Sequence, residues 1–249
     1  MRTAPRVALA AAVAALALPL PSQAWAPHVH DAASYAKQRR GIVSFAVRTA
    51  AHAYGFRARR TFPSASVLKA MLLVAYLNQR GLRDRPLKRA DKRLLGPMIR
   101  RSDNAAASAI FVTVGPRRLS ALARRAHMRR FRPVAPVWGL SRIDAEDQAR
   151  FFLNIDGLIA PRHRVYAMGL LEHITPSQRW GIGRVQPAGW RLFFKGGWGS
   201  GSGLVDHQVA LLTEGDRRVS LAILTYADGS HAYGKETLRG VAKRLLHGI

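Results

Sequence analysis

The chain has 249 residues, with 40 lysines and arginines against 14 aspartates and glutamates, a formal net charge of +26 at pH 7. It has no cysteine, which excludes a disulfide scaffold, a thiolate zinc site and a cysteine-linked lipid anchor. Hydrophobic residues make up 48% of the chain, enough at this length for a large core in one domain or in two interleaved ones.

The first residues have the pattern of a secretory signal peptide. MRTAPR carries two arginines, VALAAAVAALALPL is apolar throughout, and PSQAWA offers small residues for cleavage. With Ser22 and Ala24 at the −3 and −1 positions, residues 1–24 are predicted to be removed. The apolar run is too short to span a membrane and no other segment is long enough. We therefore expect a secreted protein, extracellular or periplasmic, with no transmembrane anchor.

Positive charge dominates the rest of the chain. Loss of Arg2 and Arg6 takes the 40 basic residues to 38, which against 14 acidic residues gives a net charge of +24. The arginines concentrate in RGLRDRPLKRADKRLLGPMIRR and PRRLSALARRAHMRRFRP. Such charge predicts nonspecific contact with anionic polymers. The arginines surround apolar Leu, Ala and Met at helical intervals, as on a solvated helical face, so specific nucleic-acid binding is not expected.

The mature chain begins with strands and continues with helices. GIVSFAVRT and AAHAYGFRA predict two short strands joined by a tight turn. From Pro63 the hydrophobic period becomes helical, in VLKAMLLVAYLNQRG, ADKRLLGPMIRR, NAAASAIFVTVG, PRRLSALARRAHM and AEDQARFFLNIDGLI. Glycines are expected to stop these helices, at Gly81, Gly96, Gly115 and Gly157.

Strands return after about Gln178, and a helix closes the chain. WRLFFKGG, LVDHQVALLTE and RRVSLAILTYAD predict the strands, and HAYGKETLRGVAKRLL predicts the helix. This order predicts an α/β protein of the α+β type, in which segments 40–60 and 190–227 form one antiparallel sheet flanked by helices. We expect a discontinuous sheet-and-helix domain from 25–61 and 178–249, with an inserted all-helical domain at 62–177.

Three short motifs carry the candidate chemistry. FPSASVLKAML places Ser66 three residues before Lys69 at a predicted helix start, so that hydroxyl and ammonium share one helix face. Ser102–Asn104, with the sequence Ser-Asp-Asn, lies at a junction between predicted helices. Lys195–Gly197, with the sequence Lys-Gly-Gly, ends a predicted strand. An isolated S-x-x-K motif is more often a capping serine and a solvated lysine. The prediction of a catalytic site therefore depends on all three motifs occurring together in this order.

These residue types are suited to acyl transfer. Serine is a poor nucleophile until a base takes its proton, and Lys69 can be that base if burial and Lys195 lower its pKa. Unpaired N–H groups at the start of a helix beginning at Ser66 can stabilise an oxyanion. Ser102 can relay a proton to the leaving nitrogen, and Asn104 can orient the substrate amide.

The order S-x-x-K, S-D-N, K-x-G is the set found in class A β-lactamases and penicillin-binding proteins. The chain resembles this family of penicillin-recognising serine hydrolases over essentially its whole mature length. The resemblance is nearest to exported β-lactamase-like hydrolases of actinobacteria, through SQRWGI and the K-x-G-W strand.

The resemblance implies a β-lactamase/DD-peptidase-like fold and a monomer without metal or cofactor. The implied substrate is a β-lactam or a related peptidoglycan-like peptide amide. The implied catalytic residues are Ser66, Lys69, Ser102 and Lys195. The implied substrate-binding residues are Asn104, Gly197 and Trp198, the last supplying the second oxyanion N–H.

Two departures from the family limit what the resemblance implies. Class A β-lactamases have an E-x-x-L-N loop whose glutamate activates the deacylating water. The nearest phrase here, RFFLN, has Arg150 in that place and belongs to a predicted helix. The nearby acids Asp144, Glu146 and Asp147 lie at a predicted helix start, where capping explains them. Gly196 replaces a hydroxyl residue that helps bind the substrate carboxylate. We therefore expect acylation with slow deacylation.

Other residue arrangements are weaker candidates. No serine lies in a G-x-S-x-G elbow. Asp206 and His207 are neighbours on a predicted strand, so they face opposite sides and cannot form a dyad. His28 and His30 could bind a metal but are expected in a frayed tail. Two functions remain: an acyl-transfer enzyme acting through Ser66, and a noncatalytic, basic, wall-associated protein that retains the fold.

Overall fold

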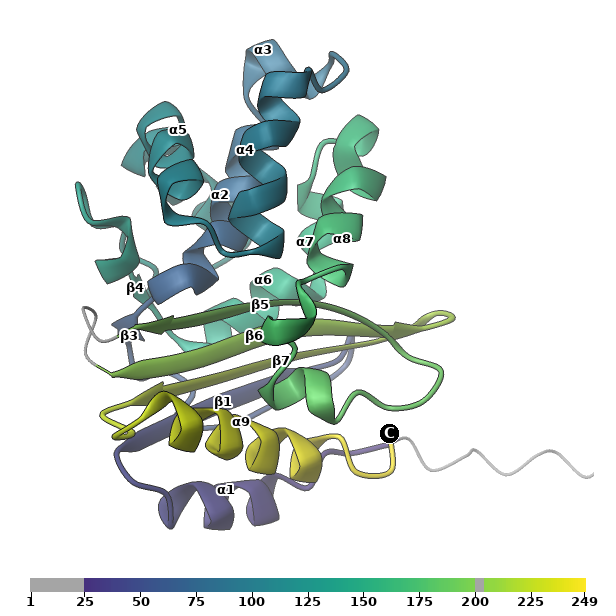
Figure 1. Ribbon diagram of the computed structural model, residues 1–249. Coiled ribbons are helices and arrows are strands. Elements are labelled where there is room, and N and C mark those ends of the chain that lie inside the picture. Colours follow the sequence, from purple (N-terminus) through teal and green to yellow (C-terminus); the bar gives the residue numbers. More distant parts are fainter. Residues whose placement is uncertain (1–24, 200–203) are drawn as a thin grey trace, which may run out of the picture.

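The computed structural model describes residues 25–199 and 204–249. The predicted signal peptide, residues 1–24, lies outside the described residues. Figure 1 shows an antiparallel sheet with two helices on one face and a larger group of helices on the other. Among the described residues, no helix is both long enough and apolar enough to cross a membrane.

The main sheet joins the two ends of the chain. Its strands are β1 (Ile42–Arg48), β2 (Ala53–Phe56), β5 (Arg191–Gly199), β6 (Val205–Glu214) and β7 (Arg217–Tyr226), in the order β2-β1-β7-β6-β5. All neighbouring strands are antiparallel, and Phe45 of β1 lies opposite Ile223 of β7. The prediction that segments 40–60 and 190–227 form one sheet is therefore confirmed. A second, two-stranded sheet joins β3 (Phe62–Pro63) and β4 (Arg142–Ile143).

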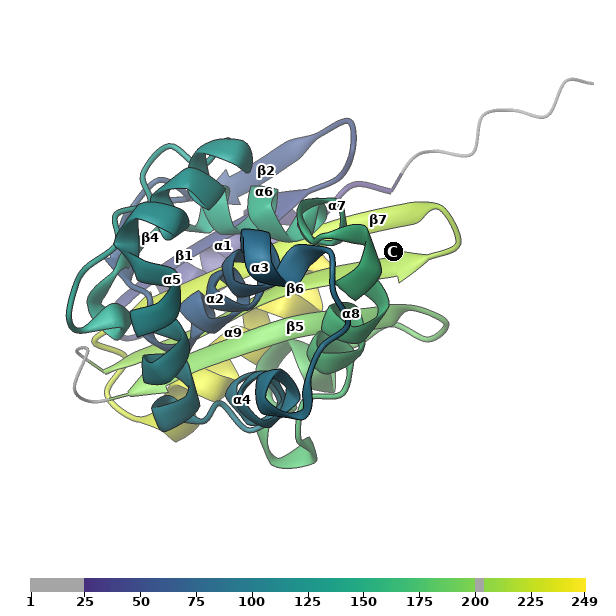
Figure 2. The ribbon, with the colours of Figure 1, turned by 90° about the horizontal axis from the view of Figure 1, so that it is seen from above.

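Two helices cover one face of this sheet. They are α1 (Val29–Lys37) and α9 (His231–Leu245), which lie side by side in Figures 1 and 2. A side chain on Gly240 would collide with the phenol of Tyr35, so the two helices pack closely because α9 has a glycine there. The frayed tail expected around His28 and His30 is wrong, because packing of buried Ala32 and Ala36 orders α1.

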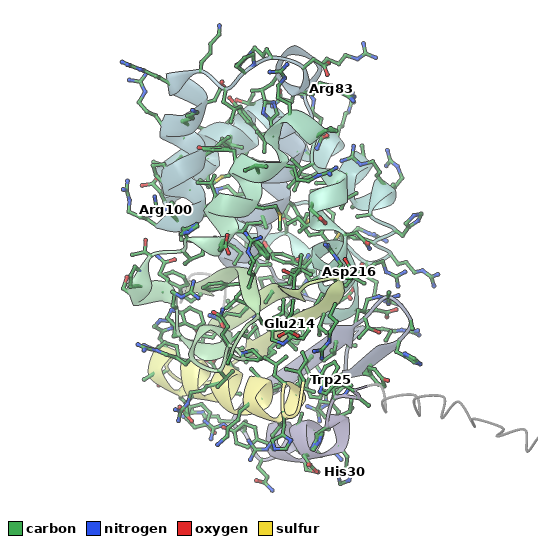
Figure 3. The ribbon with its side chains drawn as sticks, turned by 90° about the vertical axis from the view of Figure 1, so that its right-hand side faces the viewer. Trp25, His30, Arg83, Arg100, Glu214 and Asp216 are labelled. Carbon is green, nitrogen blue, oxygen red and sulfur yellow. The ribbon has the colours of Figure 1, made fainter. Side chains whose placement is uncertain are left out.

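The other face of the sheet carries the helical half of the molecule. At its centre α2 (Leu68–Leu77) is buried at every residue, which explains why its sequence is apolar all round. Around it lie α4 (Arg89–Arg100), α5 (Asn104–Arg125), α6 (Ala145–Leu153) and α8 (Arg164–Glu172). In Figure 3, Arg83 in this half and His30 on α1 mark opposite ends of the molecule.

The predicted helix stops are partly right. Gly115 has φ +71 and breaks α5 into two helical parts. Gly96 does not end α4, which continues through Gly96 and Pro97 because Met98 and Ile99 are buried in the core. Gly81 and Gly157 are inside one-turn helices, α3 (Arg80–Arg83) and α7 (Ile155–Leu158), and do not terminate longer ones. The single helix expected in AEDQARFFLNIDGLI divides at Asn154, between α6 and α7.

Short 3-10 turns connect the longer elements. They are η1 (Ala65–Val67), η2 (Trp138–Leu140), η3 (Pro161–His163), η4 (Pro176–Gln178) and η5 (Gly181–Arg184). Helix α8 and these turns follow no strong hydrophobic period, and the sequence did not predict them. The expected class, an antiparallel sheet flanked by helices with helices inserted between its strands, is confirmed. The domain boundaries at 61/62 and 177/178 stay a prediction.

Candidate active site

Ser66 and Lys69 lie where a 3-10 turn continues into the central helix. Ser66 is in η1 and Lys69 is in the first turn of α2, so Ser66 lies in the short turn that leads directly into the helix. Ala65, directly before Ser66, has φ +43, a left-handed conformation that costs alanine roughly 1 kcal/mol or more. Ser66 is 8% exposed and Lys69 is completely buried, so the site opens at the serine.

Ser102 occupies a strained turn between α4 and α5. It has φ +60, and the N–H groups of Arg101 and Asp103 both donate to the carbonyl of Pro97. Asp103 caps α5 by accepting a hydrogen bond from the Ala106 N–H at 2.7 Å. These bonds fix a conformation that serine rarely adopts, and the Ser102 hydroxyl lies beside Lys69 at the start of α2.

The hydroxyl of Ser102 accepts hydrogen bonds from two buried lysines. Lys69 Nζ lies 3.2 Å from Ser102 Oγ, and Lys195 Nζ, from β5, lies 3.1 Å from the same oxygen. Lys69 Nζ also donates to Asn104 Oδ1 at 2.7 Å and to the Ser102 carbonyl. The structure thus brings four of the proposed site residues together: Lys69, Ser102, Asn104 and Lys195.

Ser66 joins this group through the helix and not through a hydrogen bond. Among residues 25–199 and 204–249, its hydroxyl has no hydrogen-bond partner, whereas Lys69 is one turn further along the same helix face. The expected bond between Ser66 and Lys69, direct or through water, stays a prediction.

Burial changes the ionisation of both lysines. Desolvation lowers the pKa of Lys69 to about 7, although the negative charge of Asp103 acts in the opposite direction. Desolvation also lowers the pKa of Lys195, and the neighbouring Lys69 charge lowers it further. Lys69 can therefore be a neutral amine near neutral pH, which is the form that accepts a proton.

The glycine at position 197 lets β5 approach the serine. A Cβ atom at Gly197 would lie 2.8 Å from the Val67 nitrogen and 2.9 Å from the Ser66 nitrogen. Lys195 and Gly197 face the same side of β5, because side chains alternate along a strand. The spacing in K-x-G therefore lets one strand carry a lysine to Ser102 and press its backbone against η1. The oxyanion role of the Trp198 N–H stays a prediction.

Gly196 faces the opposite side of β5. A Cβ atom there would lie 3.3 Å from the ring of Trp180. Trp180 packs edge-on against Trp198 and His231, with ring centroids 5.7 and 5.3 Å apart, and Trp198 stacks on His231. A side chain at position 196 would therefore require the Trp180 ring to shift by a few tenths of an ångström.

The sequence did not predict the hydrogen bond between Asp206 and His231, whose ring stacks on Trp198. His231 Nδ1 lies 2.5 Å from Asp206 Oδ1. Burial and the neighbouring Asp228 raise the pKa of Asp206 to about 8, and burial lowers the pKa of His231. Both shifts favour the neutral groups, so at pH 7 this contact is a neutral hydrogen bond and not an ion pair. Because the two residues lie on β6 and α9, no local pattern could have predicted the pair.

Asp206 and His207 form no dyad, as expected. The buried His207 ring bonds the Pro63 carbonyl at 2.9 Å through Nε2, and its Nδ1 accepts from the Thr225 N–H at 3.2 Å. Both ring nitrogens therefore have backbone partners, and burial lowers the pKa of His207 to about 4. His207 is a neutral core residue.

The segment 133–140, PVAPVWGL, borders the site and contains no carboxylate. Lys69 Nζ lies 5.0 Å from the centre of the Trp138 ring, and the Ser64 hydroxyl lies 3.3 Å from the Gly139 carbonyl. The Trp138 indole N–H donates to the Ser108 hydroxyl at 3.1 Å. Arg150, the residue first compared with the family's glutamate, is in α6 and bonds Glu146 at 3.2 Å.

The acids at the start of α6 have structural partners. Asp144 caps the helix through the Asp147 N–H at 2.9 Å, and Asp147 accepts from the N–H groups of Arg129 and Arg130. Glu146 pairs with arginines, at 2.9 Å for Arg59. Within the described part of the chain, none of these carboxylates contacts Lys69, Ser102 or Lys195. The same part contains no cluster of three or more histidines and acids that could hold a metal ion.

Comparisons with known proteins give a consistent result. The family model described as "Beta-lactamase enzyme family" matches residues 87–249, more than half of the chain, including Ser102 and Lys195. A search of curated proteins found no match.

Solved structures share the fold at low sequence identity. The β-lactamase of Sphaerobacter thermophilus DSM 20745 gives a TM-score of 0.74 at 18% identity, over 87% of this chain and 95% of that one. The class A β-lactamase of Mycobacterium abscessus gives 0.72 at 20%, over 88% and 98%. L2, solved in complex with relebactam, gives 0.75 at 21%, over 86% and 94%.

Proposed function

Because the chain belongs to the beta-lactamase enzyme family and has a β-lactamase-like fold, we propose that it is an exported serine hydrolase. Its substrates are β-lactams or related peptide amides of the cell wall. It forms an acyl-enzyme at Ser66 and releases the acyl group slowly. The export step is supported by the signal-peptide pattern of residues 1–24.

One observation carries the proposal: two buried ammonium groups, of Lys69 and Lys195, converge on the hydroxyl of Ser102. Two like charges in a low-dielectric site are unfavourable unless one of them loses its proton. The lowered pKa of Lys69 supplies the base that Ser66 needs. Perturbed groups of this kind concentrate at catalytic sites.

Acylation proceeds by two proton transfers. Neutral Lys69 takes the proton of Ser66 as its oxygen attacks the substrate carbonyl, and the Ser66 and Trp198 N–H groups receive the oxyanion. The proton then passes from the Lys69 ammonium through Ser102 to the leaving nitrogen as the C–N bond breaks. The products are an ester at Ser66, an amine and a regenerated neutral Lys69.

The substrate lies between Asn104 and β5. The Asn104 side chain, held by Lys69, can orient the substrate amide, and the hydrogen bond from Lys195 holds the Ser102 hydroxyl beside it. Trp180 packs against Gly196, so a substrate carboxylate gains no hydroxyl partner there. Carboxylate recognition is therefore weaker than in family members that have a hydroxyl residue at this position.

Slow deacylation is supported by the composition of the neighbouring segment. Segment 133–140 contains no aspartate or glutamate. Water attack on an ester requires a base aimed at the water, and this segment supplies no carboxylate for that role. The acyl group therefore stays on Ser66 longer than in a family member whose glutamate activates the deacylating water.

The test is the intact mass of the protein after incubation with benzylpenicillin. We expect a mass increase equal to the whole penicillin, because ring opening retains all its atoms. The matched control, Ser66→Ala, lacks the nucleophile and should show no increase. Absence of an adduct on folded wild-type protein, with both benzylpenicillin and an activated ester, would reject the proposal.

The noncatalytic alternative is not favoured. A protein that used only its basic surface would gain nothing from burying Lys69 and Lys195 without a carboxylate partner. Replacing both lysines by apolar residues would stabilise such a protein. The proposal further takes the protein to be a monomer that makes nonspecific contacts with anionic polymers through its surface arginines.

A further inference from the structure

Arginines line a row of cavities away from the active site. The first cavity, of about 540 Å³, lies between the end of α2 and the second part of α5, and Arg80 and Arg118 line it. The second, of about 580 Å³, lies between β1, α6 and β7, and Arg48 and Arg150 line it. Arg125 lines both cavities, so the two are adjacent. No lining residue belongs to the proposed catalytic set.

A third cavity continues the row. It has about 520 Å³ and lies between α7, α8 and the ends of β5 and β6. Arg218 lines both the second and the third cavity, and Arg164 and Arg191 extend the basic lining. Asp156 and Glu172 also line the third cavity, and they pair with Arg218 and Arg191, each at 2.7 Å. Figures 1 and 2 show α6, α7 and α8 following one another along this side.

Several of these arginines have capacity for a ligand. Within the described residues, Arg48, Arg80, Arg118 and Arg125 form no ion pair with a carboxylate, and the Nε of Arg150 is buried without a hydrogen-bond partner. Burial and the neighbouring Arg150 lower the pKa of Arg48, which shows that positive charges are crowded here. An anion would relieve this repulsion and satisfy unused N–H groups.

We propose that this row, the arginine trough, binds a linear phosphate-bearing polyanion. The shared Arg125 and Arg218 make the row continuous, so an extended chain can place successive phosphates in successive cavities. Guanidinium groups bind phosphate through two parallel N–H donors, which suits this lining better than lysine would. The trough is separate from Ser66, and the binding does not depend on acyl transfer.

The trough selects a single chain over a duplex. Its arginines line three adjacent cavities and so follow one narrow path along the surface. A flexible single chain can follow this path, whereas duplex DNA is a wide, rigid cylinder that meets it at fewer points and makes mainly salt-dependent surface contacts. A phosphate-bearing chain is therefore the occupant that the cavities favour.

The experiment measures binding of inorganic polyphosphate to the purified protein by calorimetry, at fixed ionic strength. Arg48→Ala/Arg125→Ala should weaken binding about tenfold or more, since charge-assisted hydrogen bonds are lost. Arg80→Ala/Arg118→Ala removes exposed side chains at the first cavity and should also weaken binding.

The matched control removes two positive charges from the opposite side of the sheet. Lys37→Ala/Lys243→Ala changes exposed residues of α1 and α9 and should alter affinity by about twofold or less, because salt screens distant charges. Acylation of Ser66 should be unchanged in every variant, so failure here is distinct from failure of the proposed function. Equal weakening in trough and control variants, no binding of polyphosphate, or equally tight binding of duplex DNA would overturn the proposal.

Discussion

Lys69 and Lys195 share one acceptor: their ammonium groups lie 3.2 and 3.1 Å from the same hydroxyl, that of Ser102. The two lysines come from α2 and β5, far apart in the chain, and both are completely buried. A single hydroxyl can orient two amines, but it cannot neutralise two positive charges. The ionisation state of this pair therefore decides whether Ser66 has a base.

We predict that acylation accelerates as pH rises through about 7. Burial lowers the pKa of Lys69 to about 7, and only the neutral amine accepts the proton of Ser66. The acylation rate should rise from about pH 5.5, level off above about pH 8, and follow one ionisation. Lys69→Ala should lower the rate roughly 100- to 10,000-fold. The measurement is the rate of adduct formation by quenched-flow mass spectrometry.

The control for this assignment is Lys195→Ala. In Lys195→Ala, Lys69 stays buried, and burial is the main cause of its lowered pKa, so the acylation rate should still rise through one inflection. Loss of the inflection in Lys195→Ala would show that Lys195, and not Lys69, supplies the base.

We predict that Asp206 makes the folded protein less stable as pH rises. Burial and Asp228 raise its pKa to about 8, above the ordinary value of 3.8. The folded state thus holds a proton that the unfolded state releases, so this contribution is complete below about pH 4 and is lost as pH rises through about 8. Asp206→Asn cannot ionise, and its Tm should fall less than that of the wild type between about pH 5 and about pH 9.

The comparison needs a carboxylate that stays exposed to solvent in the folded protein. Asp84 is exposed, so Asp84→Asn should follow the wild-type curve of Tm against pH. If Asp206→Asn also follows that curve, then Asp206 is ionised in the folded protein and the neutral bond to His231 is wrong.

Sequence patterns predicted the features that depend on local spacing. Ser66 and Lys69 are three residues apart, so any helix places them on one face, and β1, β5, β6 and β7 were expected from their apolar alternation. Contacts between residues far apart in the chain have no local spacing in the sequence, so they could not be predicted. The bond between Asp206 and His231 joins a strand to a helix, and the Trp138 ring that lies near Lys69 belongs to the short turn η2, far from Lys69 in the chain.

The glycine stops show the same limit. Gly115 breaks a helix because its φ is positive, whereas Gly96 keeps a helical conformation because Met98 and Ile99 fix the next turn in the core. A glycine permits a break, and tertiary packing decides whether it occurs. The sequence therefore predicted four members of the site and the sheet, and it missed the side chains that surround them.

We predict opposite effects of alanine at two glycines. A Cβ at Gly197 would lie 2.8 Å from the Val67 nitrogen, so Gly197→Ala should separate β5 from η1 and destabilise the protein by about 1–3 kcal/mol. At Gly169, inside α8, a Cβ would meet no atom within 4 Å, so Gly169→Ala should stabilise the protein by about 0.5–1 kcal/mol through helix propensity. Urea unfolding measures both changes.

The acylation rate of Gly197→Ala distinguishes a role of Gly197 in packing from a role in placing the oxyanion donor. If the close approach of β5 also supplies the Trp198 N–H to the oxyanion, Gly197→Ala should lower the acylation rate roughly 100-fold or more, beyond its effect on stability. A variant that is destabilised but acylates at the wild-type rate would contradict the oxyanion role of Trp198.

We predict a burst of acylation followed by slow turnover. Attack on a β-lactam needs a nucleophile, a base and oxyanion donors, and Ser66, Lys69 and the two N–H groups supply them. Release needs a base directed at water, and segment 133–140 offers none. A chromogenic cephalosporin should therefore give a fast phase with about one product per enzyme, and mass spectrometry should then find most of the protein acylated.

Two variants and one added nucleophile test the cause of the slow release. Glu146 is held by arginines and Asp144 caps α6, so Glu146→Gln and Asp144→Asn should leave turnover unchanged. Hydroxylamine needs no base to attack an ester, so it should release the acyl group as a hydroxamate and restore free Ser66. Fast linear hydrolysis without a burst would mean that a base already serves the water. Loss of that hydrolysis in either variant would identify the base.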